Sequence, residues 1–279
     1  MLSMGITLKP EDFRRSLKEP SCLLISFLLC YVACPLLGLG LGMAFQLPID
    51  VLSGLVLVGS LNGAQSSNLC TFIARGDVAL SVLMTTLTTI VGIVATPLIC
   101  KLAMGTVLPV DCVGIAKSCL QVVLAPIMVG MMANKVAPKL VHKVLPLAPV
   151  VGVAATCLLV ASAVAQCAPI LKSTAGVQLQ FPVFLLHILS GVLGYWVPRT
   201  LNFTETQCRT ISIETAMKSS AFGFLLAKLH FSETAARLPP AISVIWMTVI
   251  GASMGAYWRF HPIQSLHKEP ETETETAVS

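Results

Sequence analysis

Two polar stretches interrupt hydrophobic segments at positions where a membrane helix would normally be apolar. The first is residues 62–68, Asn-Gly-Ala-Gln-Ser-Ser-Asn, and the second is residues 214–220, Glu-Thr-Ala-Met-Lys-Ser-Ser. An ionisable side chain inside a bilayer costs about 2.5–3.5 kcal/mol on insertion scales, so its presence indicates a functional site. A broken helix in each half of a chain is typical of the binding site of a transporter.

Oxygen-bearing side chains in and near these stretches have the chemistry to bind a hard cation such as Na⁺. They are Ser67, Asn68, Ser81, Thr85 and Glu214. Ser81 and Thr85 are one helical turn apart and face one side, and for these two residues alone hydrogen bonding between packed helices is the favoured explanation. Glu214 is different, because a carboxylate at this depth needs a cation or a proton.

Lys218 follows Glu214 by four residues. If the backbone is helical there, the two side chains have the favoured spacing for an ion pair, which would neutralise Glu214 without a metal. In the alternative, Lys218 extends to the membrane interface. His187, in another apolar segment, is expected to be a hydrogen-bond partner between helices rather than a proton relay.

The composition is that of a helical membrane protein with several spans. The 279 residues are 55% hydrophobic and 11% charged, with a mean hydropathy of +0.84, whereas soluble domains carry about 25% charged residues. The net charge of +5 is spread thinly between apolar segments, which argues against a nucleic-acid partner. The ten cysteines show no Cys-x-x-Cys spacing and are interpreted as packing residues. Hydrolase motifs are absent from the sequence, which argues against an enzyme.

Eight segments are long enough to cross a bilayer, which takes about 20 apolar residues. They are residues 21–45, 47–74, 78–102, 112–132, 145–167, 177–197, 206–229 and 239–258, of which 47–74 and 206–229 contain the polar breaks. With both termini on the inner side, twelve Lys and Arg residues lie inside and five outside. The positive-inside rule therefore places the termini on the cytoplasmic or stromal side.

The two broken spans predict an inverted repeat. Residues 66–75 and 219–228 share Ser-Ser, an apolar pair, Ala and a cation in step, and the breaks lie five spans apart. An odd offset reverses the orientation in the membrane. A repeat unit of five helices predicts ten spans in all, of which this chain holds eight, so that two helices would precede residue 1. In the alternative, eight spans are the whole protein.

Several short motifs resemble those of the bile acid:sodium symporter family, above all its plastid-envelope members from plants and algae. They are residues 4–8 (Met-Gly-Ile-Thr-Leu), 10–13 (Pro-Glu-Asp-Phe), 63–68, 74–81 and 209–214. The resemblance implies a core with two crossed broken helices and a separate panel of helices. The implied organisation is an inner-side amphipathic linker (1–20), core helices of the first repeat (21–104), panel helices (105–170), core helices of the second repeat (171–260) and a disordered tail (261–279).

The resemblance also implies two sodium sites at the crossing. The first would use Ser67, Asn68, Ser81, Thr85 and Glu214, all of which this chain retains. The second would use Glu214, the backbone near Thr215 and Met217, and two glutamines, but this chain has Lys218 and Cys30 at the glutamine positions. Substrate would contact Gln65 and Ser219, where the family more often has Thr and Asn.

These two departures lead to the hypothesis that the ammonium of Lys218 replaces the second Na⁺, because two cations in one cage repel each other strongly. Coupling would then use one Na⁺, or a proton if Lys218 titrates.

The expected function is sodium-coupled symport of an organic anion by alternating access. The substrate would be a bile-acid-like sterol conjugate or a small carboxylate such as pyruvate or pantoate, and the location a plastid envelope or otherwise a plasma membrane. One alternative is a cation/proton exchanger that uses Glu214 and Lys218 as its proton site, and another is a membrane subunit that transports nothing. The sequence leaves the oligomeric state open.

Overall fold

The computed structural model describes residues 20–105, 111–136, 174–231 and 233–261, together with isolated residues between 141 and 168. The described elements are helices joined by short loops, and five of them are long and apolar enough to cross a membrane. The prediction of a helical protein with several membrane spans is therefore confirmed. The predicted amphipathic linker (1–20) and the predicted disordered tail (261–279) lie almost entirely outside the described residues.

The continuous helices follow the predicted spans closely. They are α3 (Pro20–Leu28) with η1 (Leu29–Ala33) and α4 (Cys34–Ala44), α7 (Val78–Met104), α8 (Cys112–Cys119) with η2 (Leu120–Leu124) and α9 (Ala125–Val136), α12 (Thr174–Thr200), and α15 (Leu238–Phe260), which follows the short η3 (Thr234–Arg237). The predicted span 145–167 falls where only isolated residues are described, so the number of eight spans stays a prediction.

Two of these helices contain one wide turn, and each wide turn directly precedes a proline. In η1 the N–H of Cys34 donates to the carbonyl of Leu29, five residues back, just before Pro35. In η2 the N–H of Ala125 donates to the carbonyl of Leu120, just before Pro126. A proline ring collides with the carbonyl four residues before it, and a wide turn relieves that collision without ending the helix.

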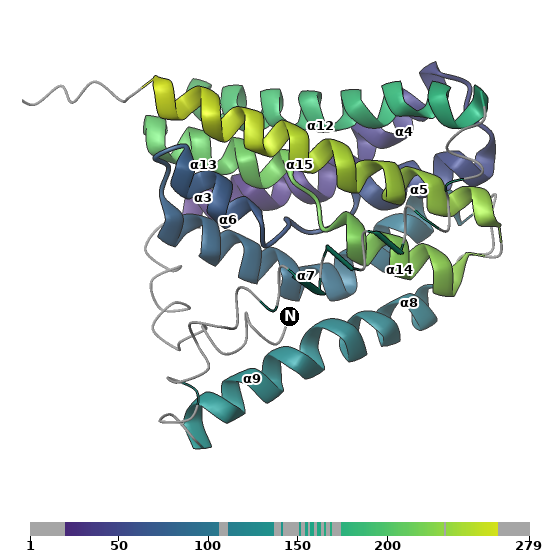
Figure 1. Cartoon of the computed structure of the whole chain (residues 1–279), viewed down its shortest axis with the longest axis horizontal. Helices are drawn as coiled ribbons and strands as arrows, with labels where there is room; N and C mark the ends of the chain where they lie inside the picture. Colours follow the sequence, from purple (N-terminus) through teal and green to yellow (C-terminus); the bar gives the residue numbers. More distant parts are fainter. Residues whose placement is uncertain are drawn as a thin grey trace, which may run out of the picture.

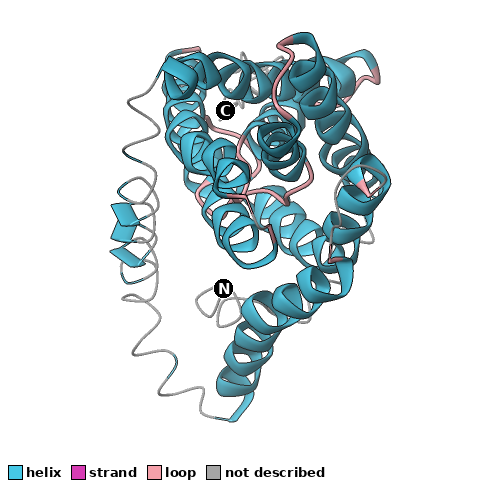
Figure 2. Ribbon diagram, turned by 90° about the vertical axis from the view of Figure 1, so that its right-hand side faces the viewer, coloured by secondary structure: helices cyan, strands magenta, loops and turns pink. Residues whose placement is uncertain are grey.

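Both predicted breaks are present. The first separates α5 (Ile49–Gly59) from α6 (Ser67–Ile73), and the second separates α13 (Glu205–Ala216) from α14 (Ser220–His230). The loops at these breaks lie inside the helical bundle (Figure 2).

The two breaks cross and pair with each other. Ala64 N–H donates to the carbonyl of Met217 at 2.8 Å, and Ser219 N–H donates to the carbonyl of Asn62 at 2.9 Å. Gly63 and Lys218 therefore form an antiparallel bridge, so that each unwound segment satisfies backbone groups of the other.

The bundle packs around these crossing helices (Figure 1). Buried apolar side chains of α5, α12, α14 and α15 form its largest cluster, which includes Leu55, Val58, Leu186, Phe224 and Ile242. Helix α8 contacts α7 and α14, whereas α9 extends away from the other helices in both views (Figures 1 and 2). Helices α8 and α9 belong to the predicted panel.

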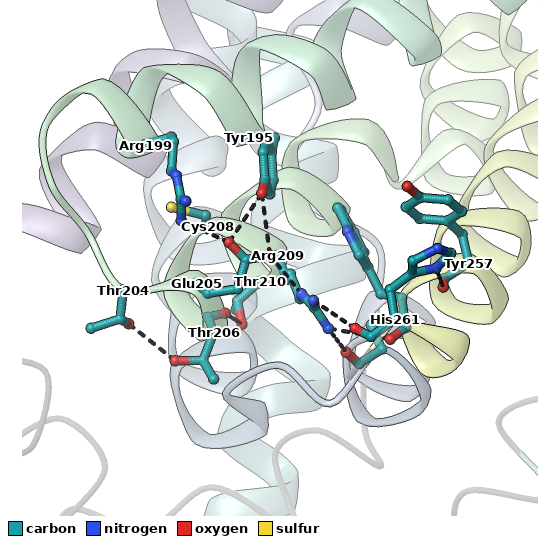
Figure 3. A network of polar contacts seen from close by, with 12 residues as sticks. Tyr195, Arg199, Thr204, Glu205, Thr206, Cys208, Arg209, Thr210, Tyr257 and His261 are labelled. Carbon is teal, nitrogen blue, oxygen red and sulfur yellow. Dashed lines mark hydrogen bonds and ion pairs between the residues drawn. The ribbon is translucent and has the colours of Figure 1, made fainter. Parts of the chain in front are cut away.

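Arg209 joins three helices at the end of the bundle where α13 begins (Figure 3). Its guanidinium donates to the carbonyls of Ala74 and Trp258 at 3.2 Å and of His261 at 2.9 Å, and it also forms an ion pair with Glu205 at 2.8 Å. These carbonyls lie at the C-terminal ends of α6 and α15, where a cation complements the helix dipole. Half of the first broken helix is thus tied to half of the second.

Candidate functional site

Glu214 lies on the last turn of α13 and is fully buried. Its Oε2 accepts hydrogen bonds from the hydroxyl of Ser67 at 2.5 Å and from that of Thr85 at 3.0 Å. Its Oε1 has no hydrogen-bond partner among the described residues. This oxygen faces Gly63, where an added Cβ would lie only 2.0 Å from it.

Asn68 extends the same cluster. Its Oδ1 accepts from the hydroxyl of Ser81 at 2.7 Å and from that of Thr85 at 3.3 Å. The five side chains expected at the first sodium site therefore lie together, although they come from three helices, α6, α7 and α13. All of them are buried except Asn68, which is half-buried.

The chemistry of this cluster suits a hard monovalent cation. It offers hydroxyl, amide and carboxylate oxygens, and one carboxylate oxygen has no hydrogen-bond partner in the described part of the chain. A buried carboxylate in this state calls for a cation or a proton. The hydroxyl and amide oxygens are hard ligands, whereas imidazole and thiolate ligands favour transition metals.

Lys218 is buried in the crossing, with 1% of its surface exposed. Because α13 ends at Ala216 and Lys218 pairs with Gly63 in an extended conformation, the helical spacing expected for an ion pair with Glu214 does not exist. The predicted pair is therefore wrong, and so is the alternative in which the side chain reaches the interface. In the described part of the chain the Lys218 Nζ has no hydrogen-bond partner within ordinary geometry.

The electrostatic neighbours of Lys218 include two thiols, those of Cys30 and Cys34. Both cysteines are fully buried, on consecutive turns around the wide turn η1. Cys34 also donates to the hydroxyl of Ser190 at 3.3 Å. The place expected for a second ion is thus lined by an ammonium and by soft sulfur atoms, neither of which suits Na⁺.

The remaining predicted residues lie along the crossing. Gln65 is exposed and follows Ala64, whereas Ser219 is half-buried and its own N–H makes one of the two backbone hydrogen bonds between the breaks. Met217 and Thr215 are buried. The hydroxyl of Thr215 bonds back to the carbonyl of Ile211 at 2.6 Å, and the carbonyl of Met217 is held by Ala64.

Each break is supported by a neighbouring continuous helix, a feature that the sequence did not indicate. On α7, Thr96 donates to the carbonyl of Ser60 at 2.8 Å, and the hydroxyl oxygen of Thr89 accepts from the side-chain amide of Asn62 at 2.6 Å. The spacing of the hydroxyl residues on α7 could have suggested this role.

The second break is supported by α12 and α15. His187 bonds the carbonyl of Ala216 at 2.6 Å and the hydroxyl of Ser243 at 2.7 Å, which confirms it as a hydrogen-bond partner between helices. Nothing in the sequence around Ser243 signalled its part in this contact.

Comparison with known proteins identifies relatives of this chain. Residues 1–174 match the model of the family described as Sodium Bile acid symporter family. The chain is 45% identical over 259 residues to the rice (Oryza sativa subsp. japonica) protein named Probable sodium/metabolite cotransporter BASS2, chloroplastic, covering 93% of this chain and 62% of that protein. It is 37% identical over 259 residues to Probable sodium/metabolite cotransporter BASS1, chloroplastic, of Arabidopsis thaliana, covering 93% and 64%.

A bacterial relative is similar over more of its own length. The chain is 35% identical over 263 residues to Uncharacterized sodium-dependent transporter YocS of Bacillus subtilis (strain 168), covering 92% of this chain and 80% of that protein. The chain spans less than two thirds of the plant proteins above. The family match and these identities confirm the resemblance seen in the motifs: this chain belongs to the sodium/bile acid symporter family, a family of membrane transporters.

Proposed function

We propose that this protein is a sodium-coupled symporter of an organic anion that works by alternating access. The observation that carries the proposal is the convergence of Ser67, Asn68, Ser81 and Thr85 around the buried carboxylate of Glu214, one oxygen of which has no hydrogen-bond partner among the residues that the structure describes. The relatives named as sodium/metabolite cotransporters support sodium as the coupling ion.

Na⁺ would serve as a co-transported ion at this cluster. Its charge would neutralise the carboxylate of Glu214. Burying that carboxylate without a counter-charge would cost free energy. Because the ligands come from both broken helices and from α7, a bound ion would hold the two breaks in one arrangement. The core, built as an inverted repeat, would then move against the panel as one body and carry ion and substrate across.

We propose that the second sodium site is replaced by Lys218. The ammonium would supply a fixed positive charge that acts on Glu214 without pairing with it, and Cys30 offers a thiol where an oxygen ligand would be needed. Two cations about 4 Å apart repel each other by about 4 kcal/mol at an effective dielectric constant of about 20. One Na⁺ per transport cycle is therefore the expected stoichiometry.

The proposed substrate is a small carboxylate, of which pyruvate and pantoate are the compounds to try first, and the proposed contacts are Gln65 and Ser219. Both residues lie at the crossing and are at least partly exposed, so an anion can reach them. The relatives named as chloroplastic support a plastid envelope as the location. The proposed substrate class and the proposed location both rest on the names of those relatives.

The test is uptake of labelled pyruvate or pantoate into proteoliposomes, measured against the external sodium concentration. We expect sodium-dependent uptake that saturates with a Hill coefficient near one. In the double variant Cys30→Gln/Lys218→Gln, which restores both glutamines, the dependence should become steeper. A Hill coefficient near two in the unchanged protein would show that Lys218 does not replace an ion.

A bile-acid conjugate serves as the third test solute and separates the two substrate classes. Proton flux measured without any organic solute separates symport from cation/proton exchange. Sodium-independent uptake of all three solutes, together with a proton flux in their absence, would overturn the proposed function.

A further inference from the structure

The buried histidine of α12 touches the helix that carries the central carboxylate. His187 is fully buried, and its Nδ1 lies 2.6 Å from the carbonyl oxygen of Ala216, the last residue of α13. A carbonyl can only accept a hydrogen bond, so the proton is on Nδ1 and the ring donates. In a neutral ring the Nε2 then accepts from the hydroxyl of Ser243, which lies 2.7 Å away.

This contact reaches both ends of the second break. Ser243 is 2.5 Å from the hydroxyl of Ser220, the first residue of α14. A chain of hydrogen bonds thus runs from the end of α13, through α12 and α15, to the start of α14. The residues in this chain of hydrogen bonds are all buried: Ala216, His187, Ser243 and Ser220. Bulk water cannot reach their polar groups, so each group needs a partner within the protein.

A second contact holds the same face of α13 one turn earlier. The hydroxyl of Ser212 donates to the carbonyl of Gly191 on α12 at 2.6 Å. The helices approach closely here, since a Cβ at Gly194 would lie 2.8 Å from the Cα of Ser212. Ser212 and Ala216 are four residues apart and therefore share the face of α13 that is turned to α12.

Glu214 lies two residues from each of these anchors, about 200° around the helix. When α12 holds Ser212 and Ala216, the side chain of Glu214 is directed to the opposite side, toward Ser67 and Thr85. We infer that His187 is a positioning residue that aims the Glu214 carboxylate at the ion cluster. This inference rests on the proposed sodium site and adds to it a residue outside the set of ligands.

The test is equilibrium binding of radioactive sodium to the purified protein in detergent, which needs no knowledge of the substrate. In His187→Leu the carbonyl of Ala216 loses its donor, and the last turn of α13 is free to fray. Replacing a partner that orients a metal ligand typically weakens binding by about 10–100-fold, and we expect at least about a tenfold rise in the sodium dissociation constant.

Two polar variants separate positioning from bulk stability. The side-chain nitrogen of Asn can occupy the place of Nδ1, so His187→Asn can still donate to Ala216, whereas His187→Gln places its amide near Nε2 and Ser243. We expect His187→Asn to keep nearly the sodium affinity of the unchanged protein and His187→Gln to lose it. Thermal unfolding of the two variants should be similar, since each keeps one of the two hydrogen bonds.

Equal sodium affinities in His187→Asn and His187→Gln would overturn the inference, and so would an unaltered affinity in His187→Leu. If the unchanged protein itself binds no sodium, the proposed function fails instead. The unchanged protein and the three variants therefore report on the two proposals separately.

Discussion

The crossing buries two side chains of opposite charge, and their surroundings differ sharply. Glu214 is surrounded by hydroxyls that donate to one of its oxygens, whereas Lys218 faces the thiols of Cys30 and Cys34. An oxygen cage around a negative charge attracts a cation, and an ammonium among thiols repels one. The first position therefore suits the Na⁺ proposed to bind there, and the second suits the fixed charge proposed to replace an ion.

Glu214→Gln should lose most of its sodium affinity. The amide keeps the shape of the side chain but not its charge, and the attraction of unit charges at 4 Å is about 4 kcal/mol at an effective dielectric constant of about 20. We expect sodium binding to weaken by at least about 100-fold, measured with radioactive sodium. Glu233→Gln, at an exposed carboxylate, is the control and should bind like the unchanged protein.

Gly63→Ala should disrupt the site from the other side of the crossing. The added Cβ would lie 2.0 Å from the Oε1 of Glu214, so either the carboxylate or the paired backbone must move. We expect sodium-dependent uptake to fall to background. Gly40→Ala is the matched control, because a Cβ there meets nothing within 4 Å, and full loss of uptake in this control would point to a general effect of the substitution.

The observed helices agree with the predicted spans wherever the length of an apolar segment is enough to define the helix. Helices α3–α4, α7, α12 and α15 agree with the predicted spans to within a few residues, because a bilayer demands about 20 apolar residues. The end of α13 could not be predicted in this way. It is decided by the carbonyl of Met217, which pairs with Ala64 from a segment about 150 residues away, and this pairing removes Lys218 from the helix.

Arg209→Met should destabilise the bundle more than a change at a neighbouring arginine. Arg209 is buried and donates to three carbonyls as well as to Glu205, and hydrogen bonds to a charged group contribute about 1.5–3 kcal/mol each. Arg199 pairs with the same carboxylate but is half exposed, where an ion pair contributes about 0–1 kcal/mol. Thermal unfolding in detergent should show a clear drop for Arg209→Met and almost none for Arg199→Gln, and equal drops would contradict this account.

At the scale of the whole molecule, α8 and α9 differ from the other helices in how they contact the bundle. Helix α8 contacts the bundle through α7 and α14, including a contact of 2.8 Å between Ser118 Oγ and His230 Nε2, while α9 extends away. If the predicted panel moves against the core during transport, this contact must change in every cycle.

A zinc bridge across that contact should stop transport. In Ser118→His the new side chain and His230 could share one Zn²⁺, since imidazole nitrogens bind it at about 2.0–2.1 Å. We expect micromolar zinc to block sodium-dependent uptake by this variant and a chelator to restore it. The unchanged protein, with His230 alone, should be insensitive, and uptake that continues in zinc-bound Ser118→His would show that α8 and α14 do not separate.

The sequence by itself determined the class of the protein, most of its spans, the position of both breaks and the set of oxygen-bearing side chains that we propose as ligands. These follow from hydropathy, from polar residues at membrane depth and from local motifs, all of which are properties of short segments. The tertiary structure decided how the breaks pair and that His187 holds the end of α13. Among the described residues, it also decided which oxygen of Glu214 is left without a hydrogen bond and that Lys218 is buried without an acidic partner. Each of these depends on backbone and side-chain groups that are distant in sequence and meet only at the crossing, where buried polar groups need partners from other helices.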